Sequence, residues 1–201
     1  GSYIDPHYLE RAAQLFDQAL KLSPNRQMYY FAKADIYNVQ KKYDLSLVEY
    51  EKALAAAPSV PQAQWYVAVT LMALGRTNEA VSFFVPLAER RYFPASVEEQ
   101  NLMAHTLDTM GRYDLSVYYY DGIAENQPKN PVVWAQFATI LAKVKHFGDA
   151  RIAARYAAAL DPSFENEAIA FIKQLPNEGK GYPLISIVII RLAHSQGYDI
   201  E

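Results

Sequence analysis

The stretch KYDLSLVEYEKALAAAP, residues 42–58, decides the fold because its pattern recurs along the chain. Its first six residues, KYDLSL, recur at residues 112–117 as RYDLSV, with arginine in place of lysine and valine in place of leucine. The prolines that close the copies of the pattern are Pro24, Pro58, Pro128 and Pro162. Their spacings are 34, 70 and 34 residues, and 70 is two periods of 34 plus an insertion of two. A fixed period of 34 predicts a chain of repeated helix–turn–helix elements.

The residues before each proline repeat by type as well as by spacing. A small residue is followed four places later by an aromatic one, then by a small or apolar residue, and five places later by the proline. The four copies are Ala12, Phe16 and Ala19; Ser46, Tyr50 and Ala53; Ser116, Tyr120 and Ile123; and Ala150, Ala154 and Ala157. The last copy departs from the pattern, because Ala154 stands where an aromatic residue is expected.

The composition is that of a folded chain without strong charge. Of its 201 residues, 51% are hydrophobic and 20% are charged, and the net charge is −3. An acidic balance argues against nucleic acid as a partner, because such proteins need a basic face. Zero cysteines exclude disulfides, thiol chemistry and cysteine-ligated zinc. No run of 18 apolar residues exists, so no direct membrane insertion is expected, and Gly1-Ser2 resembles the remnant of a cleaved tag.

The pattern is similar to that of tetratricopeptide repeat (TPR) proteins, and the fourth repeat matches best, with Trp134, Phe137, Ala138 and Leu141 at inward places. The resemblance implies an all-α, right-handed superhelical solenoid of helix–turn–helix units. It covers residues 6–175, with departures at Gln64, Tyr92, Ala154 and the insertion. The expected organisation is a leader at 1–5, a lone helix at 6–22, repeats at 27–60, 61–94, 97–130 and 131–164, a capping helix at 165–175 and a tail at 176–201.

Three short stretches also resemble the soluble TPR tails of bacterial O-antigen-ligase-like membrane proteins. They are LSPNRQ at 22–27, QWY at 64–66 and LDPSF at 160–164. This resemblance implies an accessory domain of a membrane-embedded glycan ligase or polymerase. The compartment stays open between the cytoplasm and attachment to such a membrane protein.

In TPR proteins the first helix of each repeat lines a concave groove, and this implies a set of binding positions here. The candidate groove residues are Phe31, Asp35, Asn38, Trp65, Val69, Met72, Asn101, His105, Asp108, Thr139 and Lys143. Phe31, Trp65, Val69 and Met72 would form an apolar strip, and Asp35, Glu98 and Asp108 an acidic flank. Such a groove suits a protein or peptide segment with apolar anchors and a basic residue. The alternative is that Phe31 and Trp65 pack between helices.

The sequence offers no catalytic, metal or cofactor motif. The groove positions that hold a peptide carboxylate in chaperone-binding TPR proteins carry no lysine paired with an asparagine. His105 and Asp108 share a helix face, but two ligands without a third do not predict a metal site. No nucleophile elbow or phosphate-binding glycine loop is present. The expected function is therefore a non-catalytic interaction scaffold without a cofactor.

The apolar run LISIVII at residues 184–190 is too short for a membrane span and resembles a buried strand by propensity. Three interpretations compete: an extra helix on the last repeat, an extended segment in a groove, or the start of a further domain. If the run joins two copies of the chain, the protein would be a homodimer and its function self-assembly.

Overall fold

The computed structural model describes residues 6–177 of the chain. The described residues form ten α-helices and one 3₁₀ turn and contain no strand, which confirms the prediction of an all-α helical repeat. The apolar run at 184–190, and with it the prediction of self-assembly through the tail, lies outside the described residues. Two compact units divide the chain, one ending at Tyr92 and the other beginning at Phe93. The repeat boundaries given above stay a prediction.

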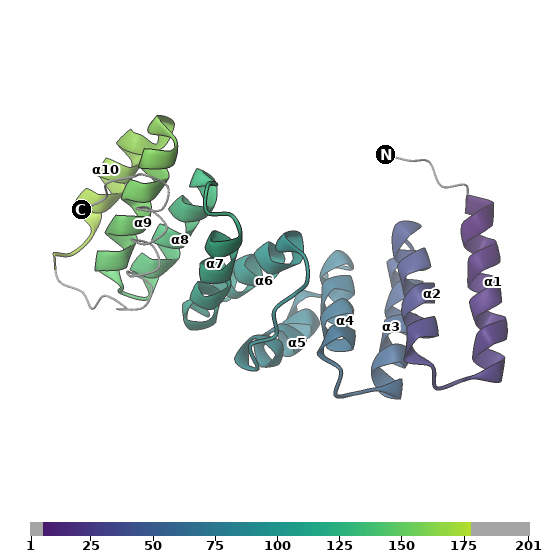
Figure 1. Cartoon of the computed structure of the whole chain (residues 1–201). Coiled ribbons are helices and arrows are strands. Elements are labelled where there is room, and N and C mark those ends of the chain that lie inside the picture. The colour runs from purple at the N-terminus through teal and green to yellow at the C-terminus, as the bar shows by residue number, and fades with distance from the viewer. Residues whose placement is uncertain (1–5, 178–201) are drawn as a thin grey trace. The chain divides into compact units, whose positions relative to one another are not determined.

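The N-terminal unit contains five helices that pack on their neighbours in chain order (Figure 1). They are α1 (Pro6–Leu22), α2 (Gln27–Val39), α3 (Tyr43–Ala56), α4 (Pro61–Ala73) and α5 (Thr77–Glu89). The tightest pairs are α2 with α3 and α4 with α5, which are the first and second helices of one repeat.

The C-terminal unit repeats this arrangement. Its elements are α6 (Val97–Thr109), α7 (Tyr113–Asn126), α8 (Pro131–Lys143), α9 (Phe147–Leu160), a 3₁₀ turn (η1, Pro162–Phe164) and α10 (Glu165–Gln174). Helix α6 pairs with α7 and α8 with α9, while α10 packs on α9. None of the helices within residues 6–177 combines the length and the apolar character that crossing a bilayer requires.

Each helix pair is joined by a tight turn of the same geometry. The second residue after the first helix has a positive φ, at Lys41 (57°), Gly75 (74°), Gly111 (71°) and Lys145 (66°). The next amide donates back to a first-helix carbonyl, as from Arg112 to Leu107 at 2.9 Å. This is the hydrogen-bonded helix end in which a left-handed residue satisfies the last carbonyls.

Small residues let the two helices of a repeat approach closely. The hydroxyl of Ser46 on α3 donates to the carbonyl of Ala34 on α2 at 2.9 Å, and that of Ser116 on α7 donates to the carbonyl of Ala104 on α6 at 3.0 Å. All four residues are fully buried. The small positions in the sequence pattern are therefore the contact points between paired helices.

The two-residue insertion is accommodated within the C-terminal unit. Phe93 stacks on Tyr119 with ring centroids 5.5 Å apart, and Gly122 gives its ring the space that a Cβ would fill. Helix α6 then begins with a capping box between Ser96 and Glu99. The segment that holds the insertion thus makes an aromatic contact on α7.

An ion cluster around the buried Lys33 connects the first three helices. The ammonium group of Lys33 on α2 lies 2.7 Å from the Asp17 carboxylate on α1 and 3.1 Å from the Glu49 carboxylate on α3. Burial by itself would lower the pKa of Lys33, but the hydrogen bonds to the two carboxylates outweigh it and raise the pKa. Lys33 therefore stays charged at the place where these helices meet.

Candidate functional site

The first helices of the N-terminal unit carry a cluster of aromatic rings. Phe31 of α2 contacts Tyr66 of α4 edge to face, with centroids 5.8 Å apart. Both rings lie over Tyr50 of α3, which stacks on Tyr66 at 5.2 Å and is 1% exposed. Phe31 and Tyr66 remain partly exposed. The cluster therefore presents two ring surfaces that a third, buried ring holds in place.

A carboxylate is fixed beside these rings. The hydroxyl of Tyr50 donates to the Asp35 carboxylate at 2.5 Å, while Asp35 itself is exposed. Burial and this hydrogen bond raise the pKa of Tyr50, so the phenol stays protonated. The carboxylate has acceptor positions left for a donor from outside. We name Phe31, Tyr66 and Asp35 the aromatic–acid patch.

The other predicted groove residues of this unit differ in exposure. Asn38 is exposed, and Val69 and Met72 are partly exposed. Trp65 is only 1% exposed, because its ring packs edge to face on Phe84 at 5.4 Å. The expectation that Trp65 is an anchor for a ligand is wrong, since its ring is in the core.

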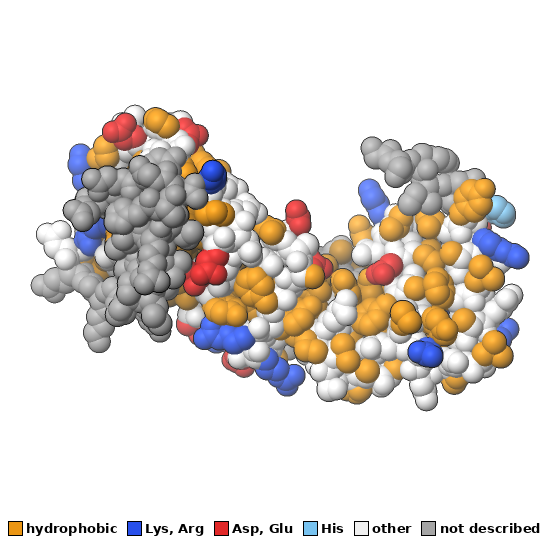
Figure 2. All heavy atoms as spheres, viewed as in Figure 1, with side chains coloured by type: hydrophobic (Ala, Val, Ile, Leu, Met, Phe, Trp, Pro, Cys, Tyr) orange, Lys and Arg blue, Asp and Glu red, His pale blue; other side chains and the backbone are white. Residues whose placement is uncertain are grey.

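Hydrophobic side chains gather on the visible face of the N-terminal unit, with a few charged groups among them (Figure 2). Exposed apolar residues of this unit include Met28, Val39, Leu45 and Val48. A surface of this kind, partly apolar and bearing isolated charges, resembles the surfaces through which proteins bind one another.

Four of the five predicted residues of the C-terminal unit pair with each other or with the backbone. Lys143 of α8 lies 2.6 Å from the Asp108 carboxylate of α6 and 4.6 Å above the ring of Tyr113. Asn101 and Thr139 donate to carbonyls of their own helices, and His105 is exposed. The acidic flank expected at Asp108 is therefore wrong, since Lys143 neutralises that carboxylate.

A hollow lies between α8, α9 and α10 in the same unit. Its floor consists of Ala135 and Ala138 from α8 and Ala154 and Ala157 from α9, and Thr139 lies at one side. The hollow exists because alanine replaces the ring that occupies the same position of the other second helices. Those rings are Phe16, Tyr50, Phe84 and Tyr120.

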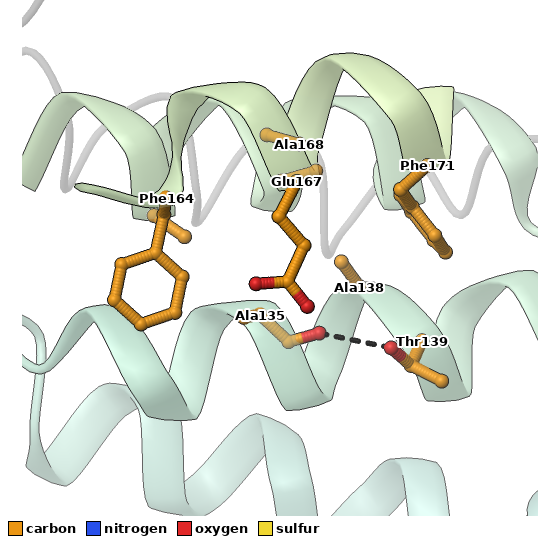
Figure 3. A pocket seen from close by; sticks show the side chains of 9 residues that line it. Ala135, Ala138, Thr139, Phe164, Glu167, Ala168 and Phe171 are labelled. Atoms are coloured by element: carbon orange, nitrogen blue, oxygen red, sulfur yellow. Dashed lines mark hydrogen bonds between the residues drawn. The ribbon is translucent and has the colours of Figure 1, made fainter. Parts of the chain in front are cut away.

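The roof of this hollow is formed by η1 and α10. Phe164, Glu167 and Phe171 point from these elements toward the helix that bears the alanines, with the carboxylate between the two rings (Figure 3). We name this site the α10 hollow. Among residues 6–177, no hydrogen bond or ion pair engages the Glu167 carboxylate. Glu167 is exposed, and a carboxylate that has no countercharge among the described residues and lies beside two rings suits a cationic group.

Of the candidate groove residues named in the sequence analysis, Thr139 lines the α10 hollow. The missing ring at Ala154 is the signal that could have located it, because the absence of a large side chain inside a repeat leaves space. Glu167 and the two phenylalanines gave no such signal, since residues 165–175 have the pattern of a helix that only caps the array. No group of three His, Asp or Glu side chains within residues 6–177 is placed to share a metal ion.

A family model links this geometry to known proteins. Residues 29–60, which include most of α2, all of α3 and the turn after them, match the model of the tetratricopeptide repeat. The fold is that of a TPR protein. The match falls on the repeat that contains Phe31, Asp35 and Tyr50.

Solved structures of TPR proteins share the fold. The chain is 19% identical to YrrB, described as a TPR protein with an unusual peptide-binding site, over 84% of this chain and 85% of that one, with a TM-score of 0.57. It is 11% identical to MamA over 80% and 86% of the chains, with a TM-score of 0.56. The C-terminal part of a TPR protein from Cytophaga hutchinsonii is 16% identical over 94% and 76%, with a TM-score of 0.54.

At these identities the likeness shows the TPR fold. No curated protein matches the sequence. The resemblance to O-antigen-ligase-like membrane proteins finds no support in these comparisons.

Proposed function

We propose that this TPR chain is a non-catalytic scaffold that binds a protein or peptide segment on the first helices of its N-terminal unit. The observation that carries the proposal is the aromatic–acid patch, in which Phe31, Tyr66 and Asp35 are held by the buried Tyr50. Rigid rings beside a fixed carboxylate lose little conformational freedom on binding, which favours affinity.

The chemistry of the patch suggests the kind of segment that it binds. An apolar side chain would pack on Phe31 and Tyr66, and a lysine or arginine would pair with Asp35. Val69 and Met72 add partly exposed apolar surface on α4. YrrB, described as a TPR protein with an unusual peptide-binding site, is a precedent for such a role of the fold.

A display library of random twelve-residue peptides tests the proposal. We expect selection on the whole chain to enrich peptides that combine apolar residues with a lysine or arginine. Binding of the enriched peptides should fall about tenfold or more with Asp35→Asn, because a hydrogen bond to a charged group contributes about 1.5–3 kcal/mol. The asparagine can still accept the Tyr50 hydrogen bond, so the fold should persist.

The matched control is Asp44→Asn, which makes the same change on the exposed start of α3. Phe31→Ala should weaken the peptides as Asp35→Asn does. Enriched peptides that bind wild type and both patch variants equally would place the site elsewhere. Failure to enrich any common pattern would contradict the proposal.

A further inference from the structure

We propose that the α10 hollow binds the side chain of an arginine from a partner protein. The inference rests on the proposed role as a protein-binding scaffold, but it concerns a separate site in the C-terminal unit. It therefore adds a second point of contact whose chemistry is defined by different residues.

The floor of the hollow suits the aliphatic part of a long side chain. Ala154 occupies the place of a ring in the other second helices, and Ala135, Ala138 and Ala157 continue this small apolar surface. Three methylene groups can lie along such a surface without leaving a polar atom unsatisfied. A bulky side chain from the protein itself fills the corresponding space at Tyr50, Phe84 and Tyr120, which are all buried.

The roof suits the charged end of that side chain. Glu167 directs its carboxylate between the rings of Phe164 and Phe171 and toward the α8 alanines (Figure 3). Among residues 6–177, no lysine, arginine or histidine lines the hollow. A cation placed there would meet one opposite charge and would lie beside two aromatic rings, on whose faces it could be received.

Arginine fits these groups better than lysine does. Its planar guanidinium can stack on an aromatic ring while it donates two parallel hydrogen bonds to one carboxylate. An ammonium group can approach the carboxylate but cannot stack in this way. The hollow should therefore prefer arginine, and it should reject a neutral side chain of the same shape.

The probe for the experiment is the tripeptide acetyl-Gly-Arg-Gly-amide, and the matched control probe contains citrulline, the neutral isostere of arginine. The protein is the full chain with labelled alanine methyl groups, observed by NMR. We expect the tripeptide to shift the methyl signals of Ala135, Ala154 and Ala168. The citrulline probe should bind at least tenfold more weakly.

Two variants test the charge. Glu167→Gln removes the carboxylate from the hollow and should weaken the tripeptide at least tenfold. Glu165→Gln makes the same change on an exposed residue of α10 that does not line the hollow, and it should change affinity less than twofold. Equal losses in the two variants would indicate general electrostatic attraction and would overturn the proposal.

Two further variants test the space. Ala154→Phe restores the ring of the other repeats and should abolish the methyl shifts. If that variant does not fold, Ala135→Leu narrows the hollow from α8 and should have the same effect. Tripeptide binding that survives either change in a folded protein would overturn the proposal.

A last variant tests whether the occupant comes from a partner. Arg191→Gln removes an arginine of the chain's own C-terminal segment and should leave tripeptide affinity unchanged. A large gain in tripeptide affinity would mean that Arg191 of this chain competes for the hollow. That result would overturn the proposal that the arginine comes from a partner protein. Because none of these readouts involves the aromatic–acid patch, failure here leaves the proposed function standing, and the reverse also holds.

Discussion

The indole nitrogen of Trp134 donates a hydrogen bond to the carbonyl oxygen of Pro128, 2.9 Å away. In α2, α4 and α6, which are the first helices of the other repeats, the residue at the same position makes the same hydrogen bond. Tyr30 donates to Pro24 at 2.8 Å, Gln64 to Pro58 at 3.0 Å and Gln100 to Pro94 at 2.9 Å. Three residue types thus make one contact, in which the first helix holds the chain segment that precedes it.

We expect this hydrogen bond to contribute more to the free energy of unfolding where it is more deeply buried. Trp134→Phe should lower the free energy of unfolding by about 2 kcal/mol, because it removes the donor and leaves both a carbonyl and some space unfilled. Tyr30→Phe removes an exposed bond, and since water can replace it the loss should be below about 0.5 kcal/mol. Urea unfolding of the two variants measures the difference. Equal losses would show that the hydrogen bond is not what distinguishes the sites.

Two of the four turns between paired helices place a lysine in the left-handed region. Because a residue with a Cβ is strained there, Lys41→Gly and Lys145→Gly should each raise the free energy of unfolding by about 1 kcal/mol. Gly75→Ala should lower it by a similar amount, and since no atom lies within 4 Å of the added Cβ, this loss would report backbone strain alone. Thermal unfolding provides the measurement, and a loss of stability in both lysine variants would contradict the argument.

The carboxyl group of Asp121 on α7 should make stability depend on pH. Burial, together with the charge of Glu125, raises its pKa to about 6, above the value of 3.8 expected in the unfolded chain. The folded state therefore holds a proton that the unfolded state releases between about pH 4 and 6, so stability should fall as pH rises through that window.

Asp121→Asn should remove this slope and stabilise the protein at pH 7 by about 1–2 kcal/mol, a range reduced for the partial exposure of the side chain. The control is Asp114→Asn on the same helix. Its hydrogen bond from Arg112 lowers the pKa of Asp114, so its contribution is present at neutral pH and is lost as pH falls. Urea unfolding between pH 4 and 8 would refute the assignment if Asp121→Asn kept the wild-type slope.

Trp65→Ala should act on folding and not directly on binding. The ring is buried against Phe84 and lies 6.1 Å from the ring of Tyr92, so its removal leaves a large space. We expect a loss of about 3–5 kcal/mol in the free energy of unfolding. Circular dichroism during heating would measure it, with Trp65→Phe as the milder change. A variant as stable as wild type would return Trp65 to the set of candidate binding residues.

The helical repeat could be read from the sequence because it depends on local patterning. Each repeat needs a small residue where its two helices meet, such as Ser46 or Ser116. The closing prolines recur at spacings of 34 or 70 residues, and both features can be seen along the chain without knowledge of its packing. The proline pattern is broken after the second repeat, where Tyr92 stands at the expected place. The structure shows Pro94 accepting the same hydrogen bond two residues later, so the contact persists where the spacing changes.

The candidate sites depended on contacts that the period does not encode. Phe31 and Trp65 hold equivalent positions in consecutive first helices, yet Phe31 is partly exposed and Trp65 is buried. The sequence shows Asp108 as an isolated negative charge. In the structure the ammonium group of Lys143, one repeat away, lies 2.6 Å from its carboxylate.

The sequence by itself therefore determined the repeat, its period and the helical class, because these follow from the spacing of residues along one chain. Only the tertiary structure decided which side chains are open to a ligand. The exposure of a side chain and the neutralisation of a charge depend on neighbours brought together by packing. The α10 hollow is the clearest case, since one alanine at position 154 becomes a site only when η1 and α10 lie over it.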